Sequence, residues 1–314
     1  MRAVWLREFG GPEVLQLGDA PDPVPGQGQV LIEVAYANIT FVETQFRAGG
    51  DSPFRVELPV IPGNGVGGTV LATGPSVDPD LVGERVISSL TGSGGYAELA
   101  VAAAATLHRV PAELPLDSAV ALLADGRTAA MLLRATEVKP GERVLVEAAA
   151  GGVGSLLVQL AVAAGATVVA AAGGAHKTEL AASLGAAEVA DYTEPGWAQR
   201  IAPVDVVFDG VGGEIGRAAF DLLGQGGRMI SYGLASGEWA GIAEETAAER
   251  GVTLVSLRPS PELVRESTRH VLAEAAAGRL HPVIGQRFPL AEAAAAHTAI
   301  ANRGTIGKTL LEVK

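Results

Sequence analysis

The pattern of apolar and polar positions changes twice along this chain of 314 residues. Up to about residue 120, short runs of alternating apolar and polar residues are separated by stretches such as Pro21-Asp-Pro-Val-Pro-Gly26. Alternation with this punctuation predicts short strands in an irregular, β-rich barrel. The predicted strands are residues 30–34, 68–72, 85–88 and 97–101.

From about residue 120 to 260, apolar strand-like runs alternate with helical segments, which predicts a doubly wound parallel sheet in an α/β protein. The predicted strands are residues 144–148, 167–172, 188–190, 204–209, 228–232 and 253–257. In the tail, we expect a helix at 261–277, a strand at 283–288, an Ala-rich helix at 291–302 and a last strand at 308–313.

The turn after residue 148 carries the spacing Ala149-x-Gly151-x-x-Gly154, and an apolar helix is predicted after it, at 156–164. A dinucleotide pyrophosphate needs such a turn, free of bulky side chains and opening into the positive end of a helix. Gly151 would let the backbone approach the phosphates, and Gly154 would let the helix pack close to its strand. The alternative is an ordinary tight turn, but the flanking strand and helix favour the dinucleotide site.

The residues after the strand that ends at Ala172 indicate which dinucleotide binds. NAD enzymes usually place Asp or Glu here, on the ribose 2′-hydroxyl. This chain has Gly173-Gly-Ala-His-Lys177, and the first acid is Glu179. A carboxylate would repel a 2′-phosphate and Lys177 would attract one, so the sequence favours NADPH. The alternative is that Lys177 is a solvated lysine in the first turn of the next helix.

Composition fits a two-domain soluble enzyme, with 48% apolar and 18% charged residues. The net charge of −12 argues against nucleic acid or an anionic membrane surface as a partner. The absence of Cys excludes disulfides and Cys-ligated metals and suits the cytoplasm. Charges at Arg2 and Arg7 do not fit a signal peptide. The charge-free stretch 148–175 is better explained by a buried helix and a buried parallel strand than by a membrane span.

Further short motifs follow one another along the chain. They are Phe9-Gly-Gly-Pro-Glu-Val-Leu15, Thr40-Phe-Val-Glu-Thr-Gln-Phe-Arg-Ala-Gly49, Gly83-Glu-Arg-Val86, Gly95-Tyr-Ala-Glu98, Leu184-Gly-Ala186, Val207-Phe-Asp-Gly-Val-Gly212 and Arg258-Pro259. Together with the glycine turn and Lys177, they make the chain resemble the zinc-independent medium-chain dehydrogenase/reductases. Within these it is most similar to the ζ-crystallin-like NADPH:quinone oxidoreductases. The resemblance covers essentially the whole chain.

The resemblance implies a GroES-like β-barrel catalytic domain from residues 1–120 and 262–314. It also implies a Rossmann NADPH-binding domain from residues 121–261, a cleft between the two for nicotinamide and substrate, and a homodimer. Gly151, Gly152, Val153 and Gly154 would hold the pyrophosphate, Gly173 would pass near the adenosine ribose, and Lys177, Tyr192 and Arg303 would bind the 2′-phosphate. Thr128 would contact the nicotinamide side, and Gly233 would lie on the loop lining that end.

Several positions depart from the family patterns. Zinc members place a Cys at Thr40 and a His-Glu pair at Asn64-Gly65, so no metal site is expected, and alcohol oxidation without a Lewis acid is disfavoured. The histidines show no ligand spacing and are expected at the surface or at helix ends; they are His108, His176, His270, His281 and His297. Quinone reductases commonly carry Asn at Thr40, Tyr at Gln45 and Lys at Asp125. Asp125-Gly-Arg127 is either a charged insertion near the cleft or a surface turn with a self-satisfied pair.

The expected reaction is direct hydride transfer from C4 of NADPH to a small quinone or enone. Thr40, Phe41 and Gln45 would form the barrel-side wall of the catalytic site, to which Asn64 and Asp125 are also assigned. Solvent, or the hydroxyl of Thr40 or Thr128, would donate a hydrogen bond to the acceptor oxygen. The alternatives are an enoyl or 2-alkenal double-bond reductase and a non-catalytic NADPH-binding protein.

Overall fold

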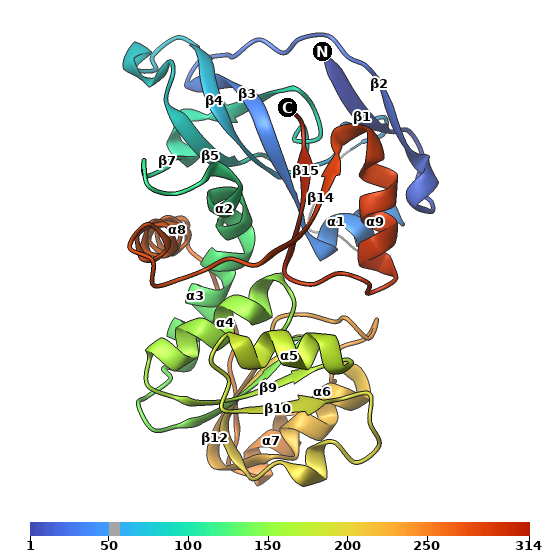
Figure 1. The fold of residues 1–314 in the computed structure, drawn as a ribbon, viewed down its shortest axis with the longest axis vertical. Helices are drawn as coiled ribbons and strands as arrows, with labels where there is room; N and C mark the ends of the chain where they lie inside the picture. The colour runs from blue at the N-terminus through green and yellow to red at the C-terminus, as the bar shows by residue number, and fades with distance from the viewer. Residues whose placement is uncertain (50–56) are drawn as a thin grey trace. The chain divides into compact units, whose positions relative to one another are not determined.

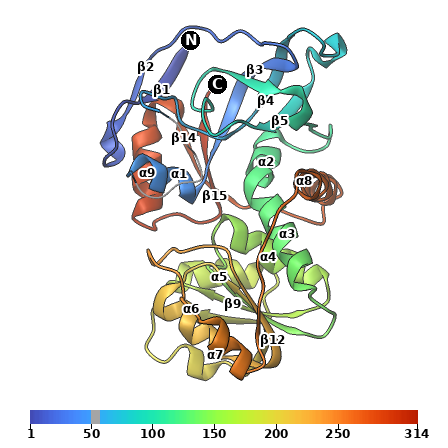
Figure 2. The ribbon, with the colours of Figure 1, turned by 180° about the vertical axis from the view of Figure 1, so that it is seen from behind.

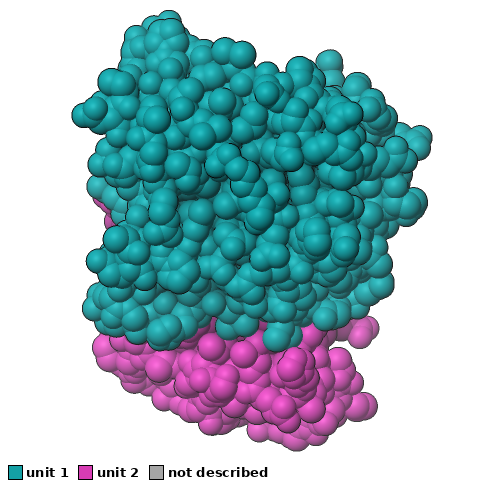
Figure 3. Space-filling model, turned by 45° about the horizontal axis from the view of Figure 1, so that its top comes forward, with its two compact units in different colours: residues 1–124, 268–314 teal, residues 125–267 magenta. Residues whose placement is uncertain are grey.

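The chain divides into two compact units in the computed structural model, which describes residues 1–49 and 57–314. Unit 1 consists of Met1–Ala124 and Thr268–Lys314, and unit 2 of Asp125–Ser267; Figure 3 colours them teal and magenta. The expected assignment of a catalytic domain (1–120 and 262–314) and a cofactor domain (121–261) stays a prediction.

Unit 2 is built on a parallel sheet with the strand order β10-β9-β8-β11-β12-β13. Helices α4 (Gly152–Ala163) and α5 (Ala175–Ser183) cover one face, and α6 (Gly213–Phe220) and α7 (Glu244–Glu249) cover the other (Figures 1 and 2). The strands are β8 Arg143–Glu147, β9 Thr167–Ala172, β10 Glu188–Asp191, β11 Val204–Asp209, β12 Leu223–Ser231 and β13 Thr253–Leu254. The predicted doubly wound Rossmann sheet is therefore confirmed.

Unit 1 contains a mostly antiparallel sheet with the order β14-β15-β3-β4-β5-β7, in which β6 also pairs with β3, and a separate two-stranded sheet of β1 and β2. The tail completes this sheet because β15 lies antiparallel to β3, with Thr309 opposite Ile39. The strands are β1 Arg2–Leu6, β2 Leu15–Asp19, β3 Gln29–Ile39, β4 Gly65–Thr73, β5 Arg85–Ser89, β6 Leu99–Ala103, β7 Leu107–Arg109, β14 Ile284–Pro289 and β15 Lys308–Glu312. The helices of this unit include α1 Phe41–Arg47, α2 Leu116–Ala121 and α9 Ala293–Ala301.

The segment around Asp125 is helical. Leu122–Gly126 forms a π-helical turn that runs directly into α3 (Arg127–Thr136). The alternative of a surface turn at Asp125-Gly-Arg127 is therefore wrong. The remaining long helix is α8, Pro261–Ala276.

No described helix combines the length and the apolar character needed to cross a membrane. The charge-free stretch 148–175 is divided among the turn after β8, helix α4 and strand β9, and most of its side chains are buried in unit 2.

The prediction for His297 is wrong, because this side chain is fully buried within α9. Its Nε2 lies 3.0 Å from the hydroxyl of Tyr96, which is also fully buried. Burial, with a smaller contribution from the charge of Arg47, lowers the pKa of His297 to about 3. Among the other histidines, His176, His270 and His281 are exposed. The buried Tyr96–His297 pair joins the C-terminal helix to the barrel of unit 1.

We expect the buried His297 to make unit 1 sensitive to acid. The unfolded chain takes up the imidazole proton near pH 6.5, whereas the folded chain does so only near the lowered pKa of about 3. The free energy of unfolding therefore falls as pH drops from 6.5 toward 3, by up to about 1.4 kcal/mol per pH unit. Urea unfolding of His297→Gln at several pH values should show a shallower acid slope, whereas the exposed His270→Gln should match the wild type. Equal slopes in His297→Gln and wild type would contradict this account.

Candidate functional site

The turn between β8 and α4 packs too closely for a side chain at Gly154. A Cβ at this position would lie 2.2 Å from the carbonyl oxygen of Ala148, which itself has a left-handed backbone (φ 48°). Helix α4 begins at Gly152, with Gly151 as its N-cap, so the first turn of the helix sits directly on the end of the strand. Exposed backbone N–H groups at a helix start attract anions.

Asp125 lies against this same turn. A Cβ at Gly152 would lie 2.0 Å from Asp125 Oδ2, so the carboxylate covers the start of α4. The negative charge of Asp125 also acts on Arg127. Burial lowers the pKa of Arg127, and Asp125 opposes this shift by a smaller amount. The structure thus places Asp125 beside Gly152, where its charge competes with any bound anion.

Three residues predicted to bind the adenosine end lie together at the carboxyl ends of β9 and β10. A Cβ at Gly173 would lie 3.1 Å from Tyr192 Cε2, and Tyr192 N donates to Ala172 O at 3.2 Å. Lys177 lies in the first turn of α5, which starts two residues after Gly173. The structure therefore brings Gly173, Lys177 and Tyr192 to one edge of the sheet.

A carboxylate that the sequence argument left out lies near this edge. Asp191, the last residue of β10, accepts hydrogen bonds from Thr193 Oγ at 2.6 Å and Thr193 N at 2.9 Å. These bonds, the side-chain one most strongly, lower the pKa of Asp191. The carboxylate is thus ionised and bound to its own loop.

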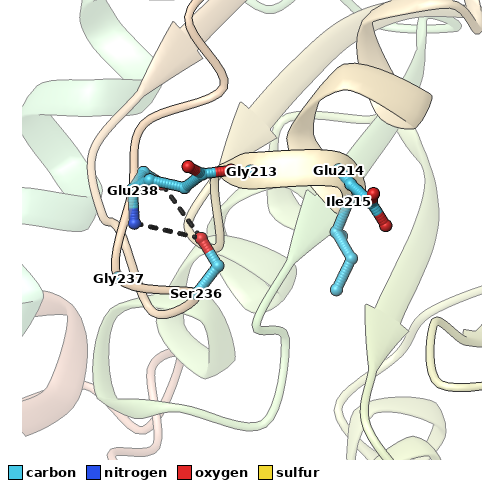
Figure 4. Close-up of a pocket in the computed structure, with 6 residues that line it drawn as sticks. All are labelled: Gly213, Glu214, Ile215, Ser236, Gly237 and Glu238. Atoms are coloured by element: carbon cyan, nitrogen blue, oxygen red, sulfur yellow. Dashed lines mark hydrogen bonds between the residues drawn. The ribbon is translucent and has the colours of Figure 1, made fainter.

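Gly233 lies on the loop after β12, close to the loop after β11. A Cβ at Gly233 would lie 2.7 Å from Gly210 O. The same loop continues to a pocket at the start of α6 (Figure 4), lined by Gly213, Glu214, Ile215, Ser236, Gly237 and Glu238. Ser236 Oγ lies 2.7 Å from Val211 O and holds the loop in place. Two glutamates line this pocket, which makes it unsuitable for a phosphate. Thr128, the other residue predicted for the nicotinamide end, lies on the first turn of α3.

In unit 1, the buried Glu43 joins Thr40 to Asn64. Thr40 donates to Glu43 Oε2 from its N (2.6 Å) and its Oγ (3.0 Å), and Asn64 N donates to Oε1 at 2.7 Å. Burial raises the pKa of Glu43, while these N–H donors and the nearby Lys308 oppose the shift. Glu43 was not among the predicted site residues, although Thr40-x-x-Glu43 is the signature of a helix capping box.

The other residues predicted for the barrel side, Phe41, Gln45 and Asn64, lie on α1 or take part in this network. Phe41 (38% exposed) and Gln45 are four residues apart on α1 and so share one face of the helix. Asn64 Oδ1 accepts a hydrogen bond from Gly92 N at 2.8 Å. Arg303, which was predicted to join the 2′-phosphate site, is exposed two residues after the end of α9 and has a left-handed backbone (φ 54°). Among the described residues, no group of His, Cys, Asp and Glu side chains could hold a metal ion.

Two family profiles match the chain. The one described as "Alcohol dehydrogenase GroES-like domain" matches residues 26–112, and the one described as "Zinc-binding dehydrogenase" matches residues 184–311. The first spans strands β3 to β7 of unit 1, and the second spans the later Rossmann strands and most of the tail. These matches agree with the observed fold.

Full-length relatives agree with this assignment. A quinone oxidoreductase of Pseudomonas aeruginosa is 33% identical over 99% of both chains, and a 2-haloacrylate reductase of Burkholderia sp is 33% identical over 98% of both. The solved structure of Escherichia coli quinone oxidoreductase complexed with NADPH is 30% identical over the whole of both chains, with a TM-score of 0.91. The chain belongs to the medium-chain dehydrogenase/reductases, in the quinone oxidoreductase group.

We expect Gly154→Ala to destabilise the protein, because its Cβ would meet the backbone oxygen of Ala148 rather than a movable side chain. The loss in free energy of unfolding should be about 1–3 kcal/mol. Gly224→Ala is the matched control, since a Cβ there has no neighbour within 4 Å. Urea unfolding measures both variants, and equal stability of the two would contradict the close approach at Gly154.

Proposed function

We propose that the protein is an NADPH-dependent oxidoreductase that reduces a quinone or a similar conjugated carbonyl compound without zinc. The observation that carries the proposal is the edge of the Rossmann sheet, where Lys177 and Tyr192 lie beside Gly173 and no acid directly follows β9. The match to quinone oxidoreductases over the full chain supports the acceptor class.

The described residues fit NADPH. The glycines of the turn add no side chains at the start of α4, where a pyrophosphate would lie beside the carboxylate of Asp125. The Lys177 ammonium suits a 2′-phosphate. Gly151 to Gly154 would hold the pyrophosphate, with Gly173, Tyr192 and Arg303 at the adenosine end and Thr128 and Gly233 at the nicotinamide end. When bound, NADPH supplies the hydride for the acceptor, and the protein supplies orientation and exclusion of water.

Unit 1 would supply the wall that faces the acceptor, from Thr40, Phe41, Gln45 and Asn64. Phe41 offers an apolar ring to a planar acceptor. The hydroxyl of Thr40 already donates a hydrogen bond to Glu43 in the structure. This favours Thr128 or solvent as the hydrogen-bond donor to the acceptor oxygen, whose negative charge grows during hydride transfer.

The donor set supports zinc independence. Zinc sites in proteins are built mainly from Cys and His, whereas Thr40 and Asn64 offer a hydroxyl and an amide. The adjacent Glu43 already accepts hydrogen bonds from Thr40 and Asn64 on both of its oxygens.

We also infer a cytoplasmic homodimer. The absence of Cys suits a reducing compartment, and the family resemblance supports the dimer.

A second candidate function is reduction of a carbon–carbon double bond. The 33% identity to a 2-haloacrylate reductase favours it, because that name describes an activated alkene substrate. Both candidate reactions use the same hydride donor and differ in the atom of the acceptor that receives it.

The experiment that tests the function follows NADPH oxidation by absorbance with 1,4-benzoquinone, 9,10-phenanthrenequinone, 2-cyclohexenone and crotonyl-CoA, with and without EDTA. We expect turnover of the quinones at a rate that EDTA does not change. Turnover of only the enone or the thioester would favour the alkene reductase. Loss of activity in EDTA that zinc restores would contradict zinc independence, and inactivity with every acceptor would contradict the proposed function.

Lys177→Ala should raise the KM for NADPH about tenfold, because one charge-assisted bond to the 2′-phosphate is lost. The KM for NADH, which has no such phosphate, should change little. Lys139→Ala is the control, since Lys139 is exposed in the loop before β8, at the opposite end of the strands. A proportionate rise in the KM for both cofactors would show that Lys177 does not select the phosphate.

A further inference from the structure

Two carboxyl side chains of unit 2 are completely buried at the ends of neighbouring strands. Glu147 is the last residue of β8 and Asp209 the last residue of β11, and neither is exposed at all. Both accept a hydrogen bond from the same amide: Val211 N lies 3.2 Å from Glu147 Oε2 and 3.1 Å from Asp209 Oδ1. The two groups are therefore close neighbours inside the protein.

Within the described part of the chain, the ionisable groups that act on the pair and on its neighbour Tyr232 are acids. Asp209 is the charged group that acts on Glu147. The pKa of Tyr232 is raised first by burial and then by Glu147 and Asp209, with smaller contributions from Tyr192 and Asp125. These tyrosines and Asp125 come from the segments after β12 and β10 and from the π-helical turn. Two ionised carboxylates this close, away from water and without a cation, would repel each other strongly.

The hydrogen bonds indicate which carboxyl holds a proton. Asp209 accepts from Gly212 N at 2.7 Å, Ser231 Oγ at 2.7 Å and Val211 N, as expected of a carboxylate. Glu147 Oε1 accepts no hydrogen bond from a described residue. Burial, then the charge of Asp209 and the hydrogen bond to it, raises the pKa of Glu147 well above its usual range.

The pair lies where the connections of the sheet change direction. The chain leaves β8 toward β9 and leaves β11 toward β12, on opposite sides, and ligands of open α/β sheets bind in the crevice at such a point. Glu147 precedes the glycine turn, and Asp209 precedes the loop of Val211 and Gly212. Tyr232 also donates its hydroxyl to Glu147 O at 2.9 Å. The pair and its neighbours thus connect the loops on both sides of the crevice.

We propose that Glu147 and Asp209 share one proton and act as positioning residues that hold these two loops together, so that NADPH affinity falls when the proton is lost at alkaline pH. The inference rests on the proposed function only for the identity of the ligand. Loss of the proton places two negative charges side by side, and their repulsion separates the glycine turn from the loop at Val211.

The test compares wild type with Glu147→Gln, since Gln is neutral at every pH and can donate to Asp209. The exposed Glu249→Gln is the control. Titration of the purified protein with NADPH should give a dissociation constant that rises about tenfold from pH 7 to pH 9.5 in wild type and control. In Glu147→Gln it should rise less than about threefold.

Urea unfolding of the protein without NADPH tests the shared proton separately. Glu147 ionises near pH 4.5 in the unfolded chain but stays protonated in the fold, so its contribution to stability is complete below that pH. The contribution to the free energy of unfolding is lost as pH rises toward the raised folded pKa. In Glu147→Gln this decrease with pH should be absent. The wild-type profile remains a test even if Glu147→Gln fails to fold.

A wild-type affinity for NADPH that does not change with pH, or an identical profile in Glu147→Gln, would overturn the positioning role. Equal pH dependence of unfolding in wild type and Glu147→Gln would overturn the shared proton. Failure to bind NADPH at any pH would instead overturn the proposed function and its link to the pair, while the unfolding profiles would still decide whether the proton is shared.

Discussion

The close approach of helix α4 to the end of β8 is the constraint on which the candidate site depends. It requires a residue without a side chain at Gly154, because Ala148 O lies where the Cβ would be. The approach directs the free N–H groups of the first turn toward the carboxyl edge of the sheet. The segments after β9, β10, β11 and β12 reach the same edge, so this one packing requirement determines the geometry of the candidate site.

Buried polar groups connect chain segments at several places in both units. Glu43 caps α1 and fixes the backbone of Asn64, while the Tyr96–His297 pair anchors the C-terminal helix. Glu147 and Asp209 do the same for the loops of the Rossmann sheet. In each case a buried side chain accepts hydrogen bonds from backbone or side-chain donors. Without it, these donors would lose their hydrogen bonds to water and gain none in the protein. The protein thus combines an apolar core with a few polar connections near its candidate sites.

The sequence predicted the doubly wound sheet and most of its strands, but not helices α1 to α3 or these polar connections. Periodicity predicted β9 and β11 at their observed bounds, and spacing predicted the glycine turn. It placed α4 four residues late, because the glycines themselves form the first turn of the helix. Glu147 and Asp209 are 62 positions apart and meet only through the pairing of β8 with β11. His297 and Tyr96 are likewise brought together by tertiary packing, so local patterns could not reveal them.

Hydrogen–deuterium exchange, measured by mass spectrometry with and without NADPH, tests the central claim most directly, because it locates the binding site without any acceptor. The account predicts slower exchange in three segments at the carboxyl edge of the sheet: the turn at 148–154, the segment 173–177 and the loop at 210–212. Binding of NADPH that leaves these amides unchanged, or protects only amides elsewhere, would contradict the account.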